Sequence, residues 1–203
     1  MDCLIIIADS SNDEVTPLLL RKYQLKSPLS IKIVEGGVPS VARNNGAKYV
    51  RTPYVLFLDA DIYISGESFL KDCLKDTITG DYDLTTCKFK TLGGSYNWVY
   101  RLFDLFQRII SRATPFAVGG FMLFKTETFN KLGGFNNEDL VAEDYHLSSK
   151  VKPSKFKTLN RFVYTTARRF ENKGVWYMFK LAWKTFLNRN NSEFYKKDHN
   201  YWT

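Results

Sequence analysis

The sequence predicts a single α/β domain with a mostly parallel central sheet and helices on both faces. The chain has 203 residues, a length that usually corresponds to one hydrophobic core. Strand-like and helix-like segments alternate through its first half, which favours strands joined by crossover helices. The run Tyr-Val-Leu-Phe-Leu at 54–58 is uniformly apolar, so a strand there should be covered on both faces.

The elements follow from apolar spacing and from turn residues. The β-branched run at 3–8 predicts a strand, and the polar turn after it contains Ser11 and Asn12, either of which is expected to cap the next helix. The run 29–34 alternates like a strand, and Gly36-Gly37 then turns the chain. The complete set of expected strands is 3–8, 29–34, 54–58, 82–88, 121–124 and 161–165. The expected helices are about 11–23, 40–50, 68–75, 96–111, 126–132, 142–151 and 175–187.

These elements suggest how the chain is organised. Residues 1–190 are expected to form the domain, which divides into two halves at 1–90 and 91–190. A polar C-terminal tail is expected at 191–203.

Composition limits the function classes. The net charge of +8 suits an anionic partner or a solvated basic surface. The basic residues form no single run and match no nucleic-acid-binding motif, so we expect no nucleic-acid partner. Cys3, Cys73 and Cys87 lack metal spacing and a pairing pattern, which favours a reducing compartment and hence the cytoplasm. The longest apolar runs fall far short of the ~20 residues that cross a bilayer, and no secretory leader is recognisable.

Two carboxylates one residue apart follow the most apolar strand. Asp59 and Asp61 would repel each other there unless a cation held them. Hard cations such as Mg²⁺ and Mn²⁺ accept carboxylate together with phosphate oxygens. An Asp-x-Asp pair is a weak signal by itself, because acidic turns are often helix caps or solvated loops.

The surrounding motifs carry a resemblance. Gly37-Val-Pro-Ser-Val-Ala-Arg43-Asn-Asn-Gly-Ala47 precedes the strand that ends Phe-Leu-Asp59-Ala-Asp61, and this pattern resembles the family 2 glycosyltransferases of GT-A fold, which is related to the Rossmann fold. Four further blocks are similar in the right order: 4–14, 121–135 ending Lys-Leu-Gly-Gly-Phe, Glu143-Asp144-Tyr-His-Leu147, and Thr165-Thr-Ala-Arg168-Arg169-Phe170. The resemblance covers about residues 3–185, and it implies a nucleotide- and metal-binding half at 1–90 and an acceptor-side half at 91–190.

The resemblance implies a metal-dependent, inverting transfer of sugar from a nucleoside diphosphate, with UDP-sugar as the default donor, to a hydroxyl of a glycan or lipid-linked acceptor. It implies a role in polysaccharide biosynthesis and Mn²⁺ or Mg²⁺ as cofactor. Asp61 and Asp59 would hold the metal, Asp144 would be the general base, and Glu143 would position Asp144 or contact the acceptor. The implied donor-binding residues are Asp9, Ser11, Arg43, Asp59, Gly119, Gly120, Arg168 and Arg169.

Several of these residues also have purely structural interpretations. Asp9 is also suited to cap a helix, Arg43 to form a structural ion pair, and Glu143 to complement a helix dipole. Gly119 and Gly120 also fit a plain strand entry, and Arg168 and Arg169 a solvated surface.

The chain also departs from the family pattern. The family normally opens with a strand of the type Val-Ser-Val-Ile-Ile-Pro and a helix, and this unit is absent here. In the family that strand is central and contributes to the nucleotide pocket. We therefore keep a second hypothesis, a catalytically silent nucleotide-sugar-binding or scaffolding module. The processive-synthase pattern Gln-x-x-Arg-Trp is missing too, which argues against a processive synthase.

Two aromatic segments are compatible with more than one packing partner. Trp98, Phe103 and Phe106 are interpreted as core in preference to an acceptor platform. The segment 175–187 mixes aromatics with lysines, so it suits either a helix packed on the core or a peripheral contact with the cytoplasmic membrane face. Core packing is the favoured interpretation for both segments.

Overall fold

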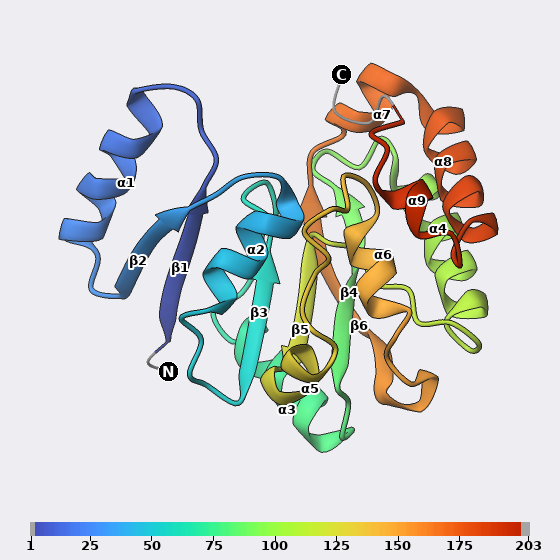
Figure 1. The fold of residues 1–203 in the computed structure, drawn as a ribbon, viewed down its shortest axis with the longest axis horizontal. Coiled ribbons are helices and arrows are strands. Elements are labelled where there is room, and N and C mark those ends of the chain that lie inside the picture. Colours follow the sequence, from blue (N-terminus) through green and yellow to red (C-terminus); the bar gives the residue numbers. More distant parts are fainter. Residues whose placement is uncertain (1–2, 200–203) are drawn as a thin grey trace.

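A computed structural model describes residues 3–199 as a mixed α/β fold with helices on both faces of the sheet (Figure 1). The strands are β1 (Leu4–Asp9), β2 (Ser30–Glu35), β3 (Tyr54–Leu58), β4 (Leu84–Thr91), β5 (Phe121–Lys125) and β6 (Phe156–Thr165). The helices are α1 (Val15–Lys26), α2 (Pro39–Ala47), α3 (Phe69–Thr79), α4 (Asn97–Ile110), α5 (Thr126–Lys131), α6 (Glu143–Ser148), α7 (Arg168–Lys173), α8 (Val175–Leu187) and α9 (Ser192–Tyr195), with a 3-10 turn at Pro153–Lys155.

The strands form two hydrogen-bonded groups. β1 and β2 pair in parallel, from Leu4 opposite Ser30 to Asp9 opposite Glu35. The other four strands lie in the order β3-β5-β4-β6. β5 is antiparallel to both β3 and β4, whereas β4 and β6 are parallel. The fold class is therefore confirmed, but the sheet is mixed where the sequence predicted mostly parallel pairing.

The direction of β5 has a local cause. After α4 the chain returns at the carboxyl end of β3, so that Phe121, the first residue of β5, lies opposite Leu58, the last residue of β3. β5 must therefore run back against β3. This arrangement brings Gly119 and Gly120 beside Asp59, whose backbone N–H donates to the carbonyl of Gly120 at 3.3 Å.

The four-stranded sheet has a hydrophobic core on each face, as its apolar strands predict. On one face Phe57 packs against Phe124, Phe129 and Phe135, with ring centroids 4.9–6.4 Å apart. On the other face Phe121, Cys87 and Phe89 pack against α3 through Phe69 and Cys73. Because alternate residues of each strand enter different cores, burial on both faces fixes the register of this sheet.

Two of the open strand edges belong to β1 and β3. Among residues 3–199, β1 pairs only with β2, and β3 pairs only with β5. Both strands line the same cleft, and α2 lies beside the space between them (Figure 1). The two groups of strands are therefore separated by a break that α2 flanks.

The helix α2 connects these two groups. On one side Gly46 lies against Ile6 of β1, where an added Cβ would meet the Ile6 side chain at 3.6 Å, and Asn45 donates to the carbonyl of Glu35 at 3.1 Å. On the other side Ser40 donates to the carbonyl of Asp139 at 3.1 Å, and Asn44 donates to the carbonyl of Phe135 at 2.7 Å. The helix that carries the Ala-Arg-Asn-Asn-Gly motif therefore connects the two groups of strands.

Some local predictions were wrong. Neither Ser11 nor Asn12 caps α1; Asp13 does so by accepting from the backbone N–H groups of Val15 and Thr16 at 2.9 and 2.7 Å. β6 is longer than expected and begins at Phe156. In its first half only Phe156 and Leu159 are buried, and the polar residues between them hid the strand pattern. The sequence analysis missed α7 and α9.

Two further expectations concerned the C-terminal tail at 191–203 and the first aromatic segment. Within 191–203, α9 buries Phe194 and Tyr195 against Tyr145, while residues 200–203 lie outside the described part of the chain. Trp98, interpreted as core, is 55% exposed.

Candidate functional site

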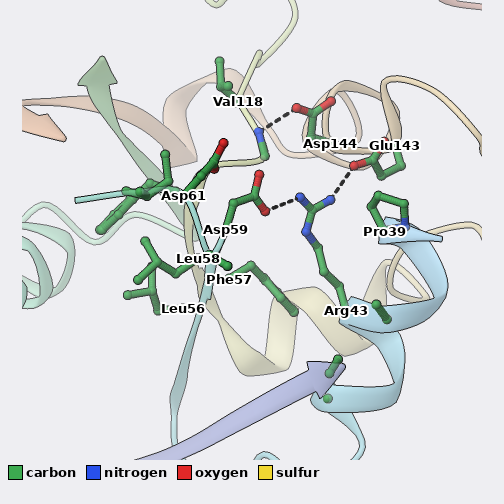
Figure 2. A pocket seen from close by; sticks show the side chains of 18 of the residues that line it. Pro39, Arg43, Leu56, Phe57, Leu58, Asp59, Asp61, Val118, Glu143 and Asp144 are labelled. Carbon is green, nitrogen blue, oxygen red and sulfur yellow. Dashed lines mark hydrogen bonds and ion pairs between the residues drawn. The ribbon is translucent and has the colours of Figure 1, made fainter. Parts of the chain in front are cut away.

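The candidate site lies where β3 ends. Asp59 and Asp61 follow Leu58 directly, and a turn in which Ile62 N–H donates to the Asp59 carbonyl at 3.1 Å holds them. Figure 2 shows both carboxylates on the side of the strand end that also faces Asp144. Within residues 3–199 Asp61 makes no hydrogen bond or ion pair. Its oxygens are therefore available to a ligand.

Arg43 connects three elements at this point (Figure 2). From α2 it donates one Nη to Asp59 Oδ1 at 2.7 Å and the other to Glu143 Oε1 of α6. Its side chain is 12% exposed and lies over the ring of Phe135. Burial alone would lower the pKa of Arg43, but the two carboxylates outweigh it and raise that pKa. Arg43 is thus a fixed cation, and the structural ion pair considered for it is present.

Asp144 is held by two backbone donors. Gly119 N–H donates to its Oδ2 at 2.6 Å, and Tyr145 N–H donates to its Oδ1 at 2.7 Å. Burial is the main cause that raises the pKa of Asp144 to about 7, and the neighbouring Glu143 raises it further, while Arg43 opposes both. A carboxyl with this pKa can exchange a proton near neutral pH.

Two glycines allow this close packing. A Cβ on Gly119 would lie 2.8 Å from Arg43 Nη2 and 3.2 Å from Asp144 Oδ2, so a side chain there would push into the ion-pair network. A Cβ on Gly120 would meet Ile62 and Phe89 at 2.9 Å. In this structure Gly120 leaves room for the core side chains Ile62 and Phe89. This is compatible with the structural interpretation of Gly120 as the entry into β5.

The backbone before α6 is unusual. Ala142 adopts the left-handed conformation with φ of 53°, although it carries a Cβ, and such backbone strain concentrates at functional sites. The buried carboxylate of Asp139 accepts a hydrogen bond from His146 Nδ1 at 2.6 Å, which ties α6 to the loop before it. The helix then presents Glu143 and Asp144 in its first turn, toward Arg43 and Gly119.

The remaining predicted site residues line the same cleft of about 2300 Å³. Asp9, at the end of β1, accepts from the backbone N–H of Ser11 at 3.0 Å. The Ser11 hydroxyl is buried and has no hydrogen-bond partner among the described residues. Arg168 and Arg169 lie at the start of α7, are exposed, and form another part of the cleft wall.

The structure therefore joins some of the predicted residues and separates others. Direct contacts link Arg43, Asp59, Glu143, Asp144 and Gly119. Asp61 lies beside this network in Figure 2, and Asp9, Ser11, Arg168 and Arg169 face the cleft from its other walls.

Metal ligands are few in this site. Within residues 3–199 no group of three or more His, Cys, Asp or Glu side chains is arranged to hold a metal. Asp59 and Asp61 provide two carboxylates, and one of them, Asp61, is unpaired. Divalent cations in phosphate-transferring sites are often held by one or two carboxylates, with substrate phosphates and water completing the shell. The donor set fits a metal that arrives together with a diphosphate.

Sequence reasoning missed Asn44. Its amide donates to the carbonyl of Phe135 at 2.7 Å and accepts from the backbone N–H of Phe135 at 3.0 Å, which ties α2 to the loop before α6. The signal was available, since Asn44 stands inside the quoted Ala-Arg-Asn motif next to Arg43.

The chain is similar to known proteins in sequence and in fold. The sequence model described as glycosyl transferase family 2 matches residues 2–133. A search of curated proteins gives no match. None of the described helices has the length and apolar character that crossing a bilayer requires.

Solved structures share the fold. The chain is similar to the mannosyltransferase PcManGT from Pyrobaculum calidifontis in complex with GDP-Man and Mn²⁺, with a TM-score of 0.67, 20% identity, and coverage of 82% of this chain and 48% of that one. It is also similar to TarS 1–349 from S. aureus, with a TM-score of 0.54, 20% identity, and coverage of 83% and 52%. The same protein in complex with UDP gives a TM-score of 0.54, 21% identity, and coverage of 81% and 51%. The chain thus spans about half the length of these structures.

Proposed function

The chain belongs to glycosyl transferase family 2, and on that premise we propose that it transfers a sugar from a nucleoside diphosphate sugar to a hydroxyl acceptor with inversion. The observation that carries the proposal is the joining of Arg43, Asp59, Glu143 and Asp144 at the end of β3, inside the large cleft. A fixed cation, two strand-end carboxylates and a carboxyl that titrates near neutrality supply the groups that this reaction requires.

Asp144 is the proposed general base. In the reaction the acceptor oxygen forms a bond to the anomeric carbon, and the bond from that carbon to the diphosphate oxygen breaks. The acceptor proton moves to the Asp144 carboxylate, and the diphosphate leaves with the bonding electrons. The two backbone donors that hold Asp144 fix its orientation, and Glu143, held by Arg43, is a positioning residue for it.

Asp61 and Asp59 are the proposed metal ligands. Mn²⁺ or Mg²⁺ would neutralise the charge that develops on the leaving diphosphate. The support from this chain is the unpaired carboxylate of Asp61 and the second oxygen of Asp59, which the Arg43 contact leaves available. The solved mannosyltransferase that shares the fold contains Mn²⁺.

The rest of the cleft would take the nucleotide. We propose that Asp9 and the unpartnered hydroxyl of Ser11 bind the base or ribose, and that Arg168 and Arg169 contact phosphate oxygens. Structures that share the fold contain GDP-Man or UDP, so both nucleotides are candidate donors, with UDP-sugar as the first choice.

The proposed partners and location complete the picture. The acceptor is a glycan or lipid-linked hydroxyl in polysaccharide biosynthesis, and the segment 175–187 takes part in a peripheral contact with the cytoplasmic membrane face. The cytoplasmic location is supported by buried Cys73 and Cys87, which are free thiols although their sulfur atoms lie 3.8 Å apart.

A donor panel tests the transferase proposal against the silent module. Purified protein is incubated with UDP- and GDP-sugars and Mn²⁺, and release of the nucleoside diphosphate is measured with and without acceptors. We expect turnover that Asp144→Asn lowers by about 10²–10⁴-fold without abolishing donor binding, because that variant loses the base. Asp81→Asn, an exposed Asp-to-Asn change at a residue that does not line the cleft, should be neutral.

Two other outcomes would reject the proposal. Donor binding without turnover in the wild-type protein would favour the silent module. Full turnover by Asp144→Asn would remove Asp144 from the role of base.

A further inference from the structure

Two helices expose apolar side chains to solvent on the same side of the molecule. α4 and α8 both lie at the edge opposite α1 (Figure 1). Their inner faces line the large cleft, α4 through Tyr100 and Phe103 and α8 through Met178 and Phe179. Their outer faces take no part in sugar transfer itself. The composition of these faces deepens the membrane contact proposed above for 175–187, because it extends the surface to α4 and indicates the lipid.

The outer face of α4 is apolar along its length. Trp98, Leu102, Leu105 and Ile109 recur at spacings of three or four residues and are 50–58% exposed. Side chains at such spacings lie on one face of a helix. The other exposed residues of this helix are Arg101 and Arg108.

The outer face of α8 repeats this composition. Trp176 is 79% exposed, Trp183 55% and Leu187 59%. Lys180 and Lys184 are the other exposed residues of the helix. Within α8 the buried residue is Thr185, so packing on the core accounts for little of the helix's apolar character. The core packing favoured in the sequence analysis therefore explains only its inner face.

No exposed acidic residue interrupts either face. α8 contains no Asp or Glu, and the single carboxyl of α4, Asp104, is half-buried on the inner side. Exposed apolar patches mark interaction surfaces. A patch that combines tryptophans with arginines and lysines, and lacks acids, complements an anionic lipid headgroup layer. A typical protein interface would instead be depleted of lysine.

We infer that the exposed faces of α4 and α8 together form a docking surface for an anionic lipid bilayer. The aromatic and aliphatic side chains would enter the headgroup region, and the four basic residues would contact lipid phosphates. The inner faces of the same helices line the cleft, so docking would place the cleft next to the bilayer. Lipid binding stands apart from sugar transfer, and the two can fail separately.

Vesicle flotation tests the docking surface without any activity assay. The full chain is mixed with vesicles of phosphatidylcholine alone or of phosphatidylcholine and phosphatidylglycerol in equal parts. We expect flotation with the anionic vesicles, weak flotation with the neutral ones, and a loss as salt is raised, since exposed charges are screened.

Two variants separate the apolar and the charged contributions. Trp98→Ser with Trp176→Ser should lower the bound fraction on anionic vesicles even at low salt. Arg101→Gln, Arg108→Gln, Lys180→Gln and Lys184→Gln together should weaken partitioning by more than about tenfold and remove the preference for anionic lipid. Leu25→Ser with Lys22→Gln is the matched control, because Leu25 is 86% exposed on α1 at the opposite edge.

A folding control and three outcomes decide the inference. All altered side chains are exposed, so circular dichroism should show unchanged folding in each variant. Wild-type protein that stays unbound with anionic vesicles at low salt would overturn the inference. Equal flotation of the variants and the wild type would overturn it as well, and a concentration-dependent dimer without flotation would assign the surface to a second copy of the chain.

Discussion

At the scale of single residues, the charge balance around Asp144 decides how the site responds to pH. Burial and Glu143 raise the pKa of Asp144 to about 7, and Arg43 lowers it. A general base works in its ionised form, so kcat/KM should rise as pH increases through about 7. The two neighbours act in opposite directions, which makes their effects on the midpoint separable.

Paired substitutions should shift that midpoint in opposite directions. Glu143→Gln removes a negative neighbour, so the Asp144 pKa should fall and the rising limb of kcat/KM should move to lower pH. Arg43→Gln removes the positive neighbour, so the limb should move to higher pH. The measurement is the pH dependence of kcat/KM for each variant with the best donor.

Structural damage alone would give a different pattern. A loss of folding lowers activity at all pH values and leaves the midpoint in place. If both variants shift the limb in the same direction, or neither does, Asp144 is not the group whose ionisation controls the reaction.

At the scale of elements, the β1–α1–β2 unit is held less firmly than the four-stranded sheet. α1 contains no buried residue, and Leu18, Leu19 and Leu25 on it are 46–86% exposed. β1 has one unpaired edge, and the contacts of the unit with the rest of the described chain run mainly through α2. β4, by contrast, is paired on both edges and buried along most of its length.

Hydrogen exchange should reveal this difference. Backbone amides of β1 and β2 should exchange about tenfold or more faster than those of β4 and β5, because local opening requires less buried surface to be exposed. Exchange is followed residue by residue under conditions where closing is fast. Equal protection in both groups of strands would contradict the assignment of β1–α1–β2 as the less stable unit.

Elements with a strong local pattern were predictable from the amino-acid sequence. β3 is predicted residue for residue, since its apolar run and flanking turns leave little alternative. α7 and the first half of β6 were missed because a helix of six residues and a strand start with few buried apolar residues both resemble loops in sequence. The direction of β5 depends on where the chain re-enters the sheet, which no local pattern contains.

The residues of the candidate site could be predicted from the sequence, but the contacts between them could not. Asp59, Asp61, Arg43, Glu143 and Asp144 stand in recognisable motifs. The bridge that Arg43 forms between Asp59 and Glu143 joins residues 16 and 100 positions away from it, so only the fold reveals it. The exposure of Trp98 could not be predicted either. An aromatic residue at helical spacing suggests core packing, and only the fold shows which face of α4 is covered.

At the scale of the whole molecule, α2 holds together two groups of strands that share no hydrogen-bonded edge within residues 3–199. The proposed base and metal residues, Asp144, Asp59 and Asp61, come from one group, and Asp9 and Ser11 come from the other. Donor binding therefore needs both groups in place, with the diphosphate and a metal near the end of β3. The most direct consequence is that a bound metal should strengthen nucleotide binding at the end of β3.

Calorimetric titration of UDP and GDP, with and without Mn²⁺, tests that claim most directly. We expect Mn²⁺ to strengthen nucleotide binding to the wild-type protein. We expect Asp61→Asn to weaken the Mn²⁺-dependent binding by about tenfold or more, because the metal site loses support. Asp81→Asn, which breaks an exposed ion pair with Lys155, should leave binding unchanged. Nucleotide binding to Asp61→Asn that equals the wild type at every Mn²⁺ concentration would contradict the account.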